Sequence, residues 1–145
     1  MALTFKDEQH YGDSANDIEQ VLGLYSQQEY PTSVYRAARC SCGGNLFQLE
    51  TDEEVGVAKR TCVACNATHY MGDSEDYAEE ATLTGHECLC DASRFELTVG
   101  VALYEESRDV RWFYIGCRCP ACGLTGVYAD WKCEGGDADE LLARV

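Results

Sequence analysis

The sequence has little of the aliphatic material from which a hydrophobic core is built. Leu, Ile, Val and Phe together number 28 of the 145 residues, about 19%. Bases are scarce too, with 11 Lys and Arg against 26 Asp and Glu and a net charge of −15. Both values lie near the compositional range of disordered chains. The chain nevertheless has only two Pro, and its nine Tyr and ten Cys indicate a folded protein. Disulfide bonds or bound metal ions would then supplement its small hydrophobic core.

Long apolar runs are also missing. The first thirty residues contain no apolar stretch of the length a secretory signal needs, and eighteen apolar residues stand together nowhere in the chain. These absences predict a cytoplasmic protein. Because thiols stay reduced in the cytosol, ten cysteines are better explained there by metal binding than by five disulfides.

The cysteines recur as two matched units. Cys-x-Cys pairs begin at Cys40 and Cys88, an offset of 48 residues, and Cys-x-x-Cys pairs begin at Cys62 and Cys119, an offset of 57. Other residues match at the same offsets, namely Phe47 with Phe95, Leu49 with Leu97, Ala64 with Ala121 and Thr68 with Thr125. The change of offset places a nine-residue insertion inside the second unit, where we expect a longer β-hairpin.

Each unit offers two thiolate pairs with a predicted hairpin between them, the arrangement by which a zinc ribbon gives one ion four tetrahedral ligands. The two predicted zinc ligand sets are Cys40, Cys42, Cys62 and Cys65, and Cys88, Cys90, Cys119 and Cys122. Glycines follow several of these cysteines, at Gly43, Gly44 and Gly123, where a turn of positive φ is expected.

The segments Cys40-Ser41-Cys42-Gly43-Gly44, Cys62-Val63-Ala64-Cys65 and Cys119-Pro120-Ala121-Cys122-Gly123 resemble the knuckles of zinc ribbons, which are rubredoxin-like. The resemblance covers residues 36 to 132 and implies two tandem ribbons that hold two structural Zn²⁺ ions per chain. The first pair of each unit departs from the commonest knuckle, since only one residue separates its cysteines. Disulfides and an iron site of rubredoxin type remain alternatives.

Two cysteines and three histidines stand outside these sets. Cys117 falls opposite Arg60 in the repeat, so we assign it as a non-ligand, although its competition with Cys119 stays open. We expect Cys133 to be a small buried hydrophobe, with a Cys117/Cys133 thiol redox pair as an alternative. His69 and His86 stand near cysteine pairs but are superfluous as ligands, and His10 lies in a polar segment.

The expected fold is a small, β-rich, metal-stabilised α+β protein. An N-terminal helical cap over 1–35 has its helix at about 14–28, where Ser14 and Asp17 suggest a capping box. The apolar face of this helix is predicted from the helical spacing of Ile18, Val21, Leu22 and Tyr25. Ribbon 1 spans 36–72, an acidic linker 73–85 and ribbon 2 86–132, and the tail 133–145 ends in a short helix. Alternating residues predict strands near 45–50, 95–103 and 110–114, with a polar turn over 105–109.

The charge bears on function. Four protein ligands at each zinc leave no open position for water or substrate, and the sequence has no nucleophile elbow and no phosphate loop, so we expect no enzyme. Two Zn(Cys)₄ centres would bring the formal charge to about −19. The primary hypothesis is therefore an acidic protein–protein interaction module, such as an inhibitor, immunity protein or regulatory adaptor for a basic partner.

The acidity also leaves alternatives. A transcription-type, nucleic-acid-associated ribbon is disfavoured by charge, and its contacts would come from a small basic group formed by Arg36, Arg39, Lys59 and Arg60. The same four bases could instead compensate the thiolates. Acidity with only three Lys is also typical of a salt-adapted proteome.

Overall fold

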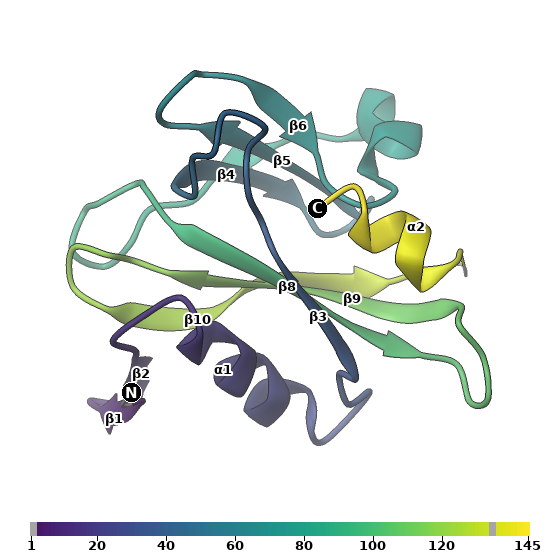
Figure 1. The fold of residues 1–145 in the computed structure, drawn as a ribbon, viewed down its shortest axis with the longest axis horizontal. Coiled ribbons are helices and arrows are strands. Elements are labelled where there is room, and N and C mark those ends of the chain that lie inside the picture. The colour runs from purple at the N-terminus through teal and green to yellow at the C-terminus, as the bar shows by residue number, and fades with distance from the viewer. Residues whose placement is uncertain (1–2, 134–135) are drawn as a thin grey trace.

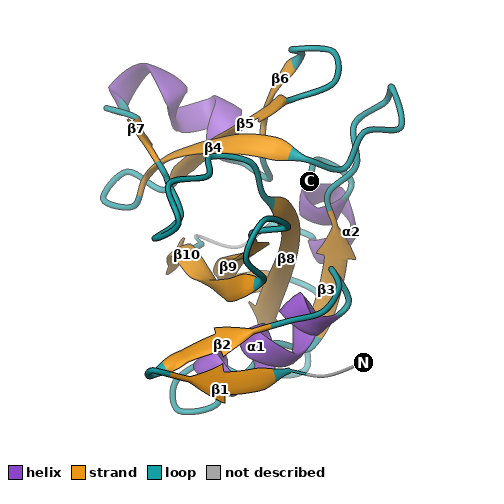
Figure 2. Cartoon of the chain, turned by 90° about the vertical axis from the view of Figure 1, so that its left-hand side faces the viewer, coloured by secondary structure: helices purple, strands orange, loops and turns teal. Residues whose placement is uncertain are grey.

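The computed structural model describes residues 3–133 and 136–145, and it is small and rich in β-structure (Figure 1). Two antiparallel sheets lie face to face, and a helix covers the outer face of the larger one (Figures 1 and 2). Residues 1–2 of the predicted cap and 134–135 of the predicted tail lie outside the described residues. Within the described part, no helix has the length and apolar character that a membrane crossing requires.

The larger sheet has six strands in the order β1-β2-β10-β9-β8-β3. Its strands are β1 (Thr4–Lys6), β2 (Gln9–Tyr11), β3 (Val34–Ala37), β8 (Glu96–Leu103), β9 (Val110–Arg118) and β10 (Leu124–Lys132). The long β8–β9 hairpin confirms the strands predicted from alternating residues. Because neighbouring residues of a strand face opposite sides, Val101 and Phe113 join the core between the sheets while Ala102 and Tyr114 meet the outer helix.

The smaller sheet has four strands in the order β6-β5-β4-β7. Its strands are β4 (Phe47–Asp52), β5 (Val57–Cys62), β6 (Thr68–Tyr70) and β7 (Thr84–Gly85). The predicted acidic linker contributes β7 and the 3₁₀ helix η1 (Ser74–Glu80). It is tied to the small sheet, because the Ser74 hydroxyl accepts a hydrogen bond of 2.9 Å from the N–H of Ala58.

The two units exchange strands. β3, which leads into the first cysteine pair of unit 1, pairs with β8 of unit 2, while β7, which leads into unit 2, pairs with β4 of unit 1. The two units also pair directly with each other. The matched residues Phe47 and Phe95 exchange two main-chain N–H···O bonds of 2.9 and 2.8 Å. Both phenyl rings are fully buried in a core cluster that contains residues of both sheets. The units therefore share one core.

The outer helix α1 (Asp17–Ser26) is shorter than the predicted 14–28. It begins at Asp17, whose carboxylate accepts hydrogen bonds from the N–H groups of Asp13 and Ser14 at 2.8 and 3.2 Å. Ile18 and Leu22 are fully buried on the large sheet, as their spacing predicts. They pack so closely on β9 that a β-carbon added to Gly116 would lie 2.5 Å from the Ile18 side chain. Tyr25, placed on the same face by the spacing, is 54% exposed.

The ends of the chain add one unpredicted element and one predicted element. The β1–β2 hairpin was missed, and it turns at Asp7 and Glu8, both of positive φ. The short helix α2 (Ala138–Leu142) is confirmed, and the Asp137 carboxylate accepts hydrogen bonds from two N–H groups of its first turn. Its buried Leu141 and Leu142 close one end of the shared core.

Candidate metal centres

The eight predicted ligands lie in or at the edge of four loops, with Cys62 the last residue of β5. We call the group of Cys40, Cys42, Cys62 and Cys65 site 1, and the group of Cys88, Cys90, Cys119 and Cys122 site 2. Site 1 joins the β3–β4 and β5–β6 connections, and site 2 joins the β7–β8 and β9–β10 connections. The hairpins β4–β5 and β8–β9 bring the two cysteine pairs of each site together, as the repeat predicts.

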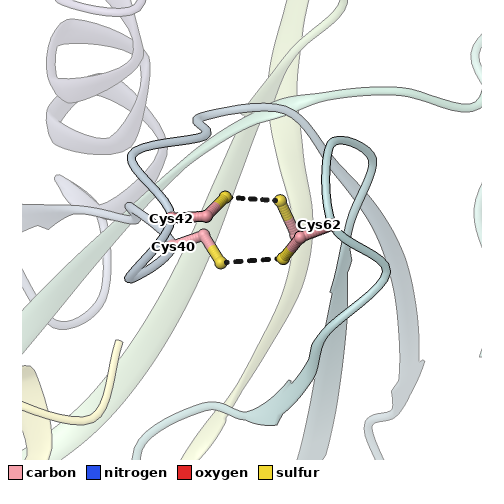
Figure 3. A group of neighbouring side chains, drawn as sticks. Cys40, Cys42 and Cys62 are labelled. Carbon is pink, nitrogen blue, oxygen red and sulfur yellow. Dashed lines mark hydrogen bonds between the residues drawn. The ribbon is translucent and has the colours of Figure 1, made fainter.

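The sulfur atoms of each site converge. In site 1 the Sγ atoms of Cys42 and Cys62 lie 3.6 Å apart, with Cys40 beside them (Figure 3). The Sγ atoms of Cys40 and Cys65 lie 3.6 Å apart as well. In site 2 the Cys88–Cys122 and Cys90–Cys119 distances are 3.5 and 3.6 Å. All four Sγ atoms of each site lie within 4.8 Å of one another.

These distances fit a tetrahedral metal site. Zinc–sulfur bonds of about 2.3 Å place two sulfurs of a tetrahedron about 3.8 Å apart, whereas a disulfide bond is about 2.05 Å long. The ten cysteines are all free of disulfides. Two Cys₄ groups that could each hold a metal ion are therefore present, and four thiolates are the donor set of structural zinc.

The four loops share one backbone geometry. In each, a residue of positive φ donates its N–H to the main-chain oxygen of the pair's first cysteine, at 2.7 to 2.9 Å. These residues are Gly43 (92°), Asn66 (63°), Asp91 (73°) and Gly123 (84°). The predicted turns at Gly43 and Gly123 are thus confirmed. The same prediction was wrong for Gly44, which does not have positive φ. A side chain is excluded there for another reason, because a β-carbon would lie 2.9 Å from the Cys62 Sγ.

The thiols of one site oppose one another's ionisation. The N–H of Cys42 is the main cause that lowers the pKa of Cys40 to about 6. At Cys42 the N–H of Gly44 acts to lower the pKa, but the three neighbouring sulfurs together raise it to about 12. Burial and the neighbouring sulfurs likewise raise the pKa of Cys88 to about 12. Four thiolates so close together need a cation among them, which a divalent metal supplies.

Comparison with known proteins gives no family for this chain. No family model, curated protein or solved structure matches it.

The remaining cysteines stand apart from both sites and from each other. Cys117 and Cys133 are buried and belong to neither group, and burial raises the pKa of Cys117 well above that of a free thiol. The N–H of Cys133 bonds to Arg111, six residues along β9 from Cys117. At about 3.3 Å per residue this separates the two by about 20 Å, too far for a disulfide. The geometry therefore argues against the Cys117/Cys133 redox pair.

The histidines near the sites make other contacts. His86 lies 2.6 Å from the Thr51 hydroxyl, and its half-burial lowers its pKa. His69 lies 2.6 Å from the main-chain oxygen of Arg144. Neither joins a cysteine group.

The four bases proposed as a nucleic-acid contact do not form one exposed patch. Arg36 and Arg39 are exposed, and Lys59 lies 3.6 Å from the Glu50 carboxylate. Arg60 is buried beside site 1. Burial lowers the pKa of its guanidinium, while the thiolates of Cys40 and Cys62 act to raise it. Its burial favours the interpretation of Arg60 as charge compensation, which the sequence had left open.

A cavity of about 310 Å³ lies between the β4–β5 turn, η1 and the end of β10. Acidic and aromatic side chains meet one base there, and the lining includes Glu53, Glu54, Asp73, Tyr77, Trp131 and Lys132. Burial raises the pKa of Asp73, and its Oδ1 atom is buried without a hydrogen-bond partner. Sequence reasoning missed this juxtaposition, because the contact between the turn and the acidic segment is tertiary.

Proposed function

We propose that the chain is a non-catalytic, cytoplasmic zinc protein in which two zinc ribbons, joined by exchanged strands, form a platform for a basic protein partner. The convergence of eight cysteine sulfurs into two groups, each within 4.8 Å, carries the zinc part of the proposal. The repeated loop geometry supports it, because all four loops turn in the same way around their first cysteine.

Metal analysis tests the zinc sites directly. Purified protein is expected to contain two Zn²⁺ ions per chain and to be colourless, whereas iron of rubredoxin type would be coloured. Zinc binding of about 10–16 kcal/mol in finger peptides exceeds the net stability of most domains, so a strong chelator should unfold the shared core. Unchanged circular dichroism and thermal stability after complete chelation would refute structural zinc.

The absence of an open ligand position supports a non-catalytic role. Each site has four cysteine sulfurs, which fill the tetrahedral coordination of zinc, so water or substrate has no place at the metal. A rigid module of this kind acts through the surface that its metal sites hold in shape.

One surface has the charge for a basic partner. The β4–β5 turn and η1 meet around the cavity described above, and η1 has no base in its last turn. We call this surface the acidic face, and its residues are Glu53, Glu54, Asp73, Glu75, Asp76, Glu79 and Glu80. Like charges gathered on one face attract a complementary basic surface and speed its association.

Affinity capture from the native host tests the partner. A basic protein should be recovered at low salt and lost as salt rises. Replacing Glu75, Asp76, Glu79 and Glu80 by their amides should abolish this recovery. The matched control replaces the exposed Glu105 and Glu106 of the β8–β9 turn by Gln and should leave capture intact. Equal capture by all three proteins would refute the role of the acidic face.

A further inference from the structure

The two metal sites differ at one matched position. Arg60 in unit 1 and Cys117 in unit 2 each stand two residues before a ligand, Cys62 and Cys119 respectively. Their registers agree as well, since Arg60 pairs across the hairpin with Leu49 and Cys117 pairs with the matched residue Leu97. Alternate residues of a strand share a face. Each side chain is therefore buried on the face that carries the following ligand, but only Arg60 is a cation.

The Arg60 guanidinium is fixed against site 1. Its Nε donates to the main-chain oxygen of Val145 at 2.7 Å, and its Cζ lies 4.5 Å from the centre of the Phe47 ring. Its Nη2 lies 3.5 Å from the main-chain oxygen of Arg39, the residue before Cys40. Burial lowers the pKa of Arg60, and the charges of Cys40 and Cys62 act to raise it. Guanidinium groups stay protonated inside proteins. A positive charge is thus held beside two ligands of site 1.

Site 2 has a thiol where site 1 has this charge, and a thiol has no cationic state. The nearest bases along the chain are directed elsewhere or exposed. Arg118 lies 2.6 Å from the Glu96 carboxylate and donates to the main-chain oxygen of Gly12, while Arg94 is exposed. Accessibility does not distinguish the sites, since each has two buried and two exposed cysteines.

The charge matters because of what metal binding does to four thiols. Four thiolates around one Zn²⁺ form a centre of net charge −2, which is more negative than the same thiols without metal. A fixed cation stabilises this centre relative to the protonated thiols. At site 1 Arg60 offsets half of the excess charge, and at site 2 the matched residue offsets none.

Resting on the proposed zinc sites, we infer that Arg60 is a built-in counterion that makes site 1 the tight centre and site 2 the labile one. Site 2 releases its metal first, and its cysteines are the first to meet electrophiles or a competing thiol-binding metal. Groups of this kind around a metal typically change its affinity by about 10–100-fold.

The test is a cysteine footprint of the zinc-loaded chain. The protein is treated with a chelator at low excess, sampled over time, alkylated with N-ethylmaleimide and analysed by peptide mass spectrometry. Modification of Cys88, Cys90, Cys119 and Cys122 is expected at least about 10-fold faster than that of Cys40, Cys42, Cys62 and Cys65. Buried Cys117 and Cys133 report global unfolding. Equal rates, or faster modification of site 1, would overturn the inference.

Variants of Arg60 test whether its charge causes the difference in metal loss between the two sites. Arg60→Met should speed metal loss from site 1 about 10–100-fold and remove the preference, whereas Arg108→Met, which removes an exposed charge in an ion pair with Asp139, should not. If Arg60→Met does not fold, Arg60→Lys keeps the charge and should keep the order of release. A Lys variant that folds but loses the order overturns the counterion role. A wild-type chain that binds no metal refutes the proposed function itself, so the two failures are distinguishable.

Discussion

Replacing Phe47 by Ala tests whether the two units unfold as one. The ring is fully buried, and the residue joins Phe95 through two main-chain hydrogen bonds at the crossing of the units. Truncating a buried Phe costs about 3–5 kcal/mol. The loss of the Arg60 contact on its ring, 4.5 Å away, adds about 0.5–2 kcal/mol. At about 3 °C per kcal/mol for a chain of this size, Tm should fall by about 10 °C or more.

Differential scanning calorimetry of the zinc-loaded protein measures this shift. Because the core contains residues of both sheets, the variant should still show a single transition, with equal calorimetric and van't Hoff enthalpies. Phe5→Ala is the control, since Phe5 is 65% exposed and its loss should cost no more than about 0.5 kcal/mol. Two transitions, one of them at the wild-type temperature, would refute the reasoning that the units share one core.

Two further substitutions test local features. Gly44→Ala should weaken metal binding at site 1 by about 10-fold or more in a chelator competition, because the new methyl would lie 2.9 Å from the Cys62 sulfur. Gly85→Ala, with no atom within 4 Å of the new methyl, should bind metal like wild type. Asp73→Asn should raise the free energy of unfolding at pH 7, because burial raises the pKa of Asp73 and its charged form opposes folding. In denaturant titrations this gain should shrink as pH falls through the raised pKa, where the native carboxyl takes up its proton; a gain that grows toward acid would contradict the assignment.

The cysteine spacing was the most informative part of the sequence. It predicted both four-cysteine groups, because ligand pairs and a hairpin between them are local features that recur in register. The repeat also contains a signal for the turns at the cysteine pairs. Aligning the units places Asp91 opposite Gly43 and Asn66 opposite Gly123. Asn and Asp tolerate positive φ better than other side chains, so the alignment alone signalled all four turns.

The exchange of strands could not be predicted in the same way. Alternating residues show which face of β3 is apolar but do not identify the strand with which β3 pairs. β7 is only two residues long, too short to form an alternating pattern. The short β1–β2 hairpin was missed for a similar reason, since its exposed residues show no apolar face. The burial of Arg60 beside site 1 could not be predicted either. A base near cysteines in the sequence can face solvent or a metal site, and only the tertiary structure decides between them.

The pairing of β3 with β8 has a consequence for synthesis on the ribosome. Val34 finds its partner in Val101, 67 residues later in the chain. At about 5–20 residues per second, roughly 3 to 13 s pass between the emergence of the two strands. Through that interval the first cysteine pair has left the ribosome without the sheet edge that anchors it. Folding of the large sheet is therefore completed late, by long-range pairing, after both cysteine pairs of site 1 have been made.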